Sequence, residues 1–134
     1  DVCSSDLIVI QAMDREAPFS VVSVEPASAR PGEVVTIIAK VKRDTSRNCS
    51  ATMSRSIFDA ANQRSDYPLQ KFSDAVIDDM EARHPGVLKV SIQVPQNASI
   101  GTARLVSVLD YRCNRVHAFF PIEVTTTMPF TVVE

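Results

Sequence analysis

The sequence predicts an all-β fold, an antiparallel β-sandwich of about seven strands. Apolar and polar residues alternate along several short runs, as they do in strands that bury one face. Turn-forming pairs such as Pro31–Gly32 and Pro85–Gly86 separate these runs. The 134 residues are the usual size of one domain and can enclose a hydrophobic core. We therefore expect one sandwich domain over residues 18–134.

Three strands are expected in the first half of the chain. Residues 19–24 and 33–43 flank the segment EPASARPG, whose prolines end the first strand and form a turn before the second. A third strand is expected within residues 49–59. Period-two alternation places the following residues on inward faces: Val35, Ile37, Ala39 and Val41 in the second strand, and Cys49, Ala51, Met53 and Ile57 in the third.

The middle of the chain allows two interpretations. Residues 60–68, AANQRSDYP, are expected to be a polar loop. Residues 69–84 fit a helix, because Leu69, Phe72, Val76 and Met80 recur at helical spacing, but they also fit a pair of strands. We favour strands because every neighbouring segment is β.

Strong strand patterns return after Pro85–Gly86. Residues 87–95 and 102–113 alternate clearly, and residues 121–134 form a last strand that we expect to be broken or bulged near Met128 and Pro129. The expected inward residues are Leu88, Val90, Ile92 and Val94, followed by Leu105, Leu109, Tyr111 and Cys113.

Two segments resemble a known family. Residues 25–37, EPASARPGEVVTI, resemble the first two strands of bacterial or phage immunoglobulin-like domains, and residues 110–113, DYRC, resemble the tyrosine corner of such folds. The resemblance covers most of residues 18–134 and implies an immunoglobulin-like sandwich. The chain departs from antibody domains in having no Trp and in placing Cys49 beyond the second strand.

Cys49 and Cys113 are expected to form a disulfide. In a sandwich of this order, the third strand begins and the sixth strand ends at the same pole. A bond closing so long a loop would stabilise the fold by roughly 4 kcal/mol in the chain-entropy model and would persist only in an oxidising compartment. The alternative is two separate buried thiols.

The N-terminal residues are expected to lie outside the domain. Residues 1–7, DVCSSDL, resemble a translated sequencing adapter, and we interpret them, with Cys3, as foreign to the protein rather than as a polar N-terminus. Residues 8–17 fit the end of a truncated membrane anchor or signal segment followed by a linker; an edge strand or a loose terminus fits equally well.

Composition and motifs argue against several function classes. A net charge of -2 disfavours nucleic acid as a partner, and three glycines cannot build a phosphate-binding loop. His84 reads as a solvated loop residue, and Asp78, Asp79 and Glu81 as a solvated acidic edge. We expect no catalytic residue, no metal and no cofactor.

The segment RCNRVHAFFPI is the candidate binding surface. It concentrates cationic and aromatic residues, which are enriched at interface hot spots: Arg112, Arg115, His117, Phe119 and Phe120. The alternative is that both phenylalanines pack into the end of the sandwich.

These observations favour a non-enzymatic interaction module, periplasmic or extracellular. Its partner is expected to be an unidentified protein or cell-surface component, with the membrane reached only through a missing N-terminal anchor. The alternatives are a secreted enzyme or metal-binding domain with an unrecognised site, and a purely structural spacer.

Overall fold

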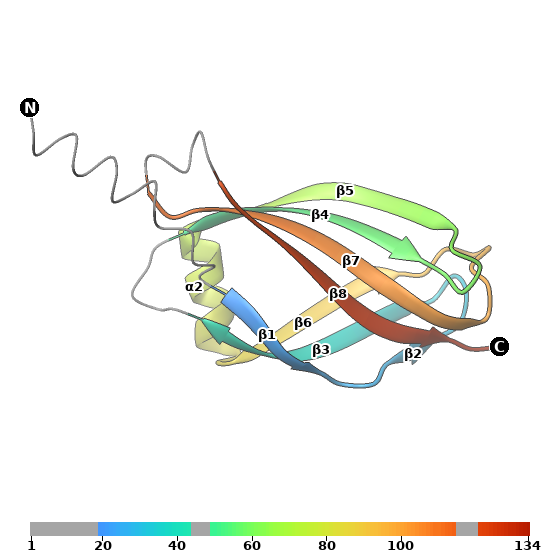
Figure 1. Ribbon diagram of the computed structural model, residues 1–134. Coiled ribbons are helices and arrows are strands. Elements are labelled where there is room, and N and C mark those ends of the chain that lie inside the picture. Colours follow the sequence, from blue (N-terminus) through green and yellow to red (C-terminus); the bar gives the residue numbers. More distant parts are fainter. Residues whose placement is uncertain (1–18, 44–48, 115–120) are drawn as a thin grey trace, which may run out of the picture.

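The protein folds as two β-sheets packed face to face, as the sequence predicts (Figure 1). A computed structural model describes residues 19–43, 49–114 and 121–134. Within these ranges no helix has the length and apolar character needed to cross a bilayer. Residues 1–17, including the proposed adapter and anchor segments, lie outside the described part of the chain.

The smaller sheet contains three antiparallel strands in the order β1-β3-β6. These are β1 (Phe19–Val24), β3 (Val34–Arg43) and β6 (Val87–Gln93). The β3 strand lies between the other two, and its inward residues Val35, Ile37 and Ala39 are almost completely buried.

The larger sheet contains five strands in the order β2-β8-β7-β4-β5. These are β2 (Ser28–Ala29), β8 (Ile122–Val132), β7 (Gly101–Arg112), β4 (Ser50–Phe58) and β5 (Arg64–Phe72). The short β2 pairs in parallel with the end of β8, and the remaining pairs are antiparallel. The described residues thus form eight strands, where the sequence suggested about seven.

One end of the sandwich is tightly joined, and we call it the closed end. The carboxylate of Asp59, in the turn between β4 and β5, accepts hydrogen bonds from the backbone N–H groups of Ala61 and Gln63 at 3.0 and 2.9 Å. It also accepts one at 3.0 Å from the N–H of Ser99, in the loop between the sheets. Side chains at this end fill the core, and the largest fully buried ones are Val35, Ile37, Ile57, Val94, Leu105 and Val132.

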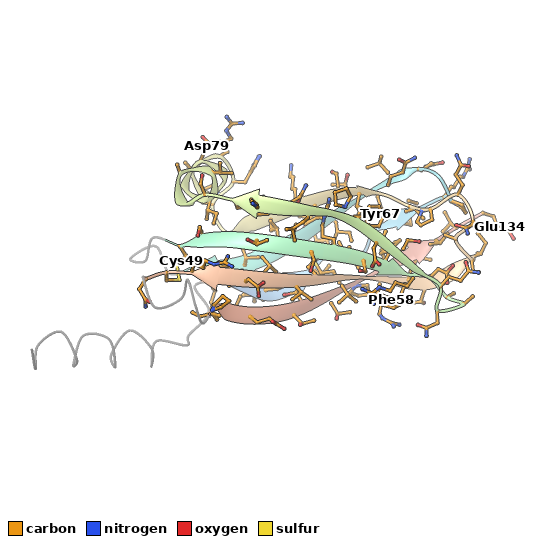
Figure 2. The ribbon with its side chains drawn as sticks, turned by 90° about the horizontal axis from the view of Figure 1, so that it is seen from above. Cys49, Phe58, Tyr67, Asp79 and Glu134 are labelled. Atoms are coloured by element: carbon orange, nitrogen blue, oxygen red, sulfur yellow. A yellow bond between two sulfur atoms is a disulfide. The ribbon has the colours of Figure 1, made fainter. Side chains whose placement is uncertain are left out.

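The opposite end carries the helix α2 (Asp74–Arg83), and we call it the open end. Figure 2 shows Cys49 and Asp79 at this end and Phe58 and Glu134 toward the other. The helix lies where the chain crosses from β5 in the larger sheet to β6 in the smaller one (Figure 1).

The preference for strands across residues 69–84 is therefore wrong for the second part of that range. Residues up to Phe72 belong to β5, because Phe72 pairs with Ala51. Ser73 then caps a helix: its hydroxyl accepts a hydrogen bond from the N–H of Val76 at 3.3 Å. The expected polar loop at residues 60–68 is also wrong from Arg64 onward, since Arg64 to Tyr67 pair with β4 as an exposed edge strand.

The last strand is continuous, contrary to the expected break near Met128 and Pro129. β8 pairs with β7 without a register shift from Ile122 to Val132. The N–H groups of Thr131 and Val133 point toward the β2 segment, where they bond to Ala27 and Ala29. Pro129 has the same parity as Thr131 and Val133, so the backbone nitrogen of Pro129 faces away from β7. Its lack of an N–H therefore costs no hydrogen bond between β8 and β7.

Candidate functional site

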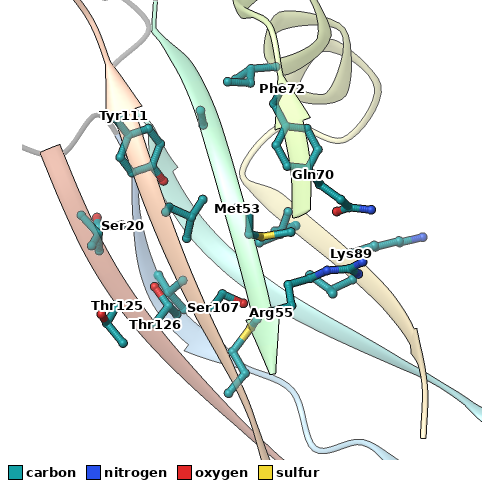
Figure 3. A pocket seen from close by; sticks show the side chains of 18 of the residues that line it. Ser20, Met53, Arg55, Gln70, Phe72, Lys89, Ser107, Tyr111, Thr125 and Thr126 are labelled. Carbon is teal, nitrogen blue, oxygen red and sulfur yellow. The ribbon is translucent and has the colours of Figure 1, made fainter. Parts of the chain in front are cut away.

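A pocket of about 680 Å³ lies between the two sheets toward the open end (Figure 3). Its walls come from both sheets and from α2, which contributes Ile77. A volume of this size falls within the range of pockets that hold small ligands, roughly 300 to 1,000 Å³. The pocket is therefore large enough to be a binding site.

The pocket exists because the inward side chains change character along the larger sheet. At the closed end, Ile57 and Leu105 face each other in register and are fully buried. Two positions further toward the open end, the inward residues of four adjacent strands are polar. In register from β5 to β8 they are Tyr67, Arg55, Ser107 and Thr126. We call this set the polar row.

The polar row separates two groups of buried apolar residues. The main core lies on the closed side and includes Ile57, Leu105 and Met128. A smaller cluster lies on the open side and includes Ala51, Tyr111 and Ile122, with Phe72 packed against it. The pocket occupies the space between them. Its floor is formed by three members of the polar row, Arg55, Ser107 and Thr126, together with the next row of inward residues, Gln70, Met53, Leu109 and Val124.

Arg55 is the most unusual member of the polar row. Its Nε atom is shielded from solvent and has no hydrogen-bond partner among the described residues. Its guanidinium carbon lies 5.9 Å from the centre of the Tyr67 ring, close enough for a cation–π contact. The Arg55 side chain as a whole is half-buried, so it is the shielded N–H group that lacks a partner, and this group can donate to an acceptor that enters the pocket.

The charged groups around the pocket are all positive. The described lining residues include Arg55 and Lys89 and no Asp or Glu. Figure 3 shows both cations with Gln70 on the side formed by β5 and β6, and Ser20 and Thr125 on the opposite side. The pocket therefore has a cationic side, although the whole chain carries a net charge of -2.

Of the two tyrosines, Tyr111 lines the pocket, and Tyr67 lies beside Arg55 outside the lining. Burial raises the pKa of Tyr111 to about 12, so its hydroxyl stays protonated at neutral pH. Burial also raises the pKa of Tyr67, and the positive charge of Arg55 acts in the opposite direction. The Tyr67 hydroxyl donates to the backbone carbonyl of Gln93 and so joins β5 to β6 across the two sheets.

The predicted disulfide between Cys49 and Cys113 is confirmed, with an S–S distance of 2.05 Å. It joins the start of β4 to the end of β7 within one sheet, since the adjacent residues Ser50 and Arg112 are paired in register. Cys49 also lines the pocket. The bond therefore fixes the pocket's outer end. Tyr111 lies near the end of β7, unlike the tyrosine corner of immunoglobulin domains, which stands near the start of its strand.

The binding surface expected from the sequence is only partly described. Arg112 projects from the face of the larger sheet opposite the pocket, where its Nη1 atom donates to the Thr52 hydroxyl at 3.3 Å. The other four candidates, Arg115, His117, Phe119 and Phe120, lie outside the described residues. No group of three or more His, Cys, Asp or Glu side chains suited to a metal ion is found within the described ranges.

Sequence reasoning missed Arg55, although the signal was present. Arg55 has the same parity as Ala51, Met53 and Ile57, which were assigned to the inward face. A charged residue at an inward position of an otherwise apolar strand indicates a special environment. The remaining members of the polar row could be found only from the pairing register of four strands.

No protein-family model and no curated protein matches this chain. Among solved structures, it is similar to the sensor domain of the anti-sigma factor RsgI4 from Pseudobacteroides cellulosolvens, at 13% identity and a TM-score of 0.37 over 87% of this chain and 98% of that one. It is also similar to Spo0M, a sporulation control protein from Bacillus subtilis, at 14% identity and a TM-score of 0.39. That match covers 87% of this chain and 50% of Spo0M. At these identities the likeness concerns a β-rich fold alone.

Proposed function

We propose that this chain is a non-enzymatic binding domain that receives a small, largely apolar ligand between its two sheets. The observation that carries this proposal is the buried, unpartnered Nε of Arg55 at the floor of the pocket. A folded protein that needed only stability would fill this space with apolar side chains, because an unfilled space and a shielded donor without a partner are both destabilising. A ligand-binding role accounts for both the pocket and the unpartnered Nε of Arg55.

The chemistry of the lining favours binding over catalysis. Hydroxyl groups from Ser107 and Thr126 are present, but the described lining contains no His, Asp or Glu that could act as a general base toward them. Apolar walls with a few placed polar groups are typical of sites that hold and orient a ligand.

The proposal includes an immunoglobulin-like architecture. In the order of the chain, β1, β3 and β6 correspond to strands A, B and E of such domains, and β4, β5, β7 and β8 to strands C, C′, F and G. The helix α2 then lies where many immunoglobulin-like domains have a further strand, in the sheet that contains strands A, B and E. This correspondence supports the class suggested by residues 25–37.

We further propose that the domain works in the periplasm or outside the cell, as a module that presents its bound state to a protein or cell-surface component. The Cys49–Cys113 disulfide supports an oxidising compartment. Membrane tethering through an N-terminal anchor is part of the same proposal.

The binding function is tested with a neutral fluorescent apolar probe, N-phenylnaphthylamine, titrated into the full chain. Ser107 is 2% exposed and lies in the polar row, so Ser107→Leu should occupy pocket space and abolish saturable probe binding. Ser54→Leu makes the same change on the exposed outer face of β4 and should leave binding unchanged. Melting curves check that both variants fold. Equal binding by a folded Ser107→Leu protein would contradict the proposal.

A further inference from the structure

We propose that the ligand is a single-chain amphiphile with a terminal carboxylate, of the fatty-acid class, whose carboxylate pairs with Arg55. This inference rests on the proposed function, because it requires the pocket to be a binding site. It adds the chemical class of the ligand and the residue that selects it.

Arg55 has no carboxylate partner among the described residues. Other described arginines have partners: Arg64 lies 2.7 Å from Asp66 and Arg83 lies 3.2 Å from Asp79, both at exposed positions. Arg104 and Arg112 donate instead to the neutral side chains of Asn62 and Thr52. Arg55 is less exposed than Arg64 or Arg83 and has an unpartnered Nε. Because a half-buried cation with a shielded, unpartnered N–H group needs compensation more than an exposed one, an anionic ligand group is the natural partner.

The hydrogen-bond donors at and around Arg55 suit a carboxylate. A guanidinium presents a planar fork of N–H groups that matches the two oxygens of a carboxylate. Ser107 lies beside Arg55 in register, and the Gln70 amide lies on the same side of the pocket (Figure 3). Lys89 is exposed at the rim of this side and can attract an anion as it enters.

Apolar residues line the pocket next to Arg55. Beyond the polar row toward the open end, the inward residues are Met53 and Leu109, and then Ala51 and Tyr111. Ala51 lies four positions before Arg55 in β4, which corresponds to about 13 Å of strand. Phe72 and Ile77 add further apolar surface. The site therefore combines one half-buried cation with a long apolar wall, which suits one charged head and one hydrocarbon chain.

The test compares ligands that share one chain and differ in the head group. Dodecanoate, dodecanol and dodecyl phosphate, each below its micelle concentration, are titrated against the full chain by displacement of N-phenylnaphthylamine and by calorimetry. We expect dodecanoate to bind roughly tenfold to a hundredfold more tightly than dodecanol, the range of one charge-assisted hydrogen-bonded pair. From octanoate to dodecanoate, each added methylene should strengthen binding about threefold to fourfold.

Arg55→Met is the decisive variant, since methionine keeps an unbranched apolar stem and removes the charge. It should reduce the affinity for dodecanoate to that for dodecanol while leaving dodecanol binding nearly unchanged. Arg104→Met is the matched control, because Arg104 lies on the outer face, with its guanidinium carbon 4.5 Å from the centre of the Phe58 ring. It should leave both affinities as they are.

The outcomes separate this inference from the proposed function. If dodecanoate and dodecanol bind equally well, the pocket is a binding site but the carboxylate assignment is wrong. If dodecyl phosphate binds more tightly than dodecanoate and loses this affinity in Arg55→Met, the preferred head group is a phosphate and the carboxylate assignment is overturned. If the neutral probe and all three amphiphiles fail to bind, the proposed function fails as well.

Discussion

The two ends of the sandwich use the same strands in different ways. β4 and β7 pair along their whole shared length, yet their inward residues are Ile57 and Leu105 at the closed end and Arg55 and Ser107 one row further on. The closed end is a filled core, whereas the open end encloses a pocket of about 680 Å³. A single row of polar side chains thus marks the point where the filled core gives way to the pocket, while the pairing of the strands stays intact.

The two ends are also held together by different means. Apolar packing and the hydrogen bonds of Asp59 join the sheets at the closed end. At the open end, the apolar cluster is small, and the disulfide ties β4 to β7. The open end is therefore reinforced by a covalent bond within the larger sheet, whereas packing and hydrogen bonds join the two sheets at the closed end.

Loss of the disulfide should have the largest effect. The disulfide joins residues that are 64 positions apart. In the chain-entropy model, a bond that closes a loop of this size stabilises the fold by about 4 kcal/mol. Replacing both cysteines by Ser should lower the free energy of unfolding by about that amount, measured by denaturant titration. Hydrogen exchange should rise first at amides of the open end, such as Ala51 and Tyr111. An equal rise in hydrogen exchange at both ends would contradict the expected difference between them.

Truncation of two leucines on one face of β7 should give unequal effects. Leu105 is fully buried in the main core, so Leu105→Ala should destabilise the fold by about 3 kcal/mol. Leu109 is only partly buried and already borders the pocket, so Leu109→Ala should cost about 1 kcal/mol. Thermal melts of the two variants measure the difference. Equal losses would mean that the pocket is filled in solution by packed side chains.

The closed end should make stability sensitive to acid. Backbone hydrogen bonds, the largest of them from Ser99, hold the pKa of Asp59 below its ordinary value of 3.8. A carboxylate whose folded pKa is depressed contributes stability above its unfolded pKa, and that contribution is lost as the pH falls through the folded pKa. Melts from neutral pH down to about pH 3 should show this loss in the native protein and a smaller one in Asp59→Asn. The pKa of exposed Asp66 is also lowered, by Ser56 and Arg64, so Asp66→Asn serves as the comparison.

The smallest effect on stability is expected from removing the charge at the centre of the site. In the absence of ligand, Arg55→Met should be neutral or slightly stabilising, because it replaces a poorly compensated cation by an apolar side chain. A thermal melt without added ligand measures this. A loss of stability comparable to that of Leu105→Ala would show that Arg55 is a structural residue instead.

The sequence predicts the strands well because their inward faces alternate strictly, as in Val35, Ile37 and Ala39. It also predicts the disulfide, since both cysteines fall at strand ends of one pole. For residues 69–84 the sequence allows a helix or strands, and the strand interpretation that we favoured is wrong for α2. Ser73, Arg83 and Pro85 are ordinary signals for a helix start and stop, but the β character of the neighbouring segments outweighed them. The pocket could not be predicted, because alternation identifies the inward face of each strand but not which residues of different strands share a row.

The most direct test of the account is a two-dimensional amide NMR titration of the full chain with N-phenylnaphthylamine. The aromatic probe shifts the resonances of nearby amides through its ring current. The account predicts saturable shifts that are largest at Met53, Arg55, Ser107 and Leu109, with little change at Asp59 and Ala98 of the closed end. Shifts concentrated on outward residues such as Ser54 and Thr102, or no saturable shift at all, would contradict a binding site between the sheets.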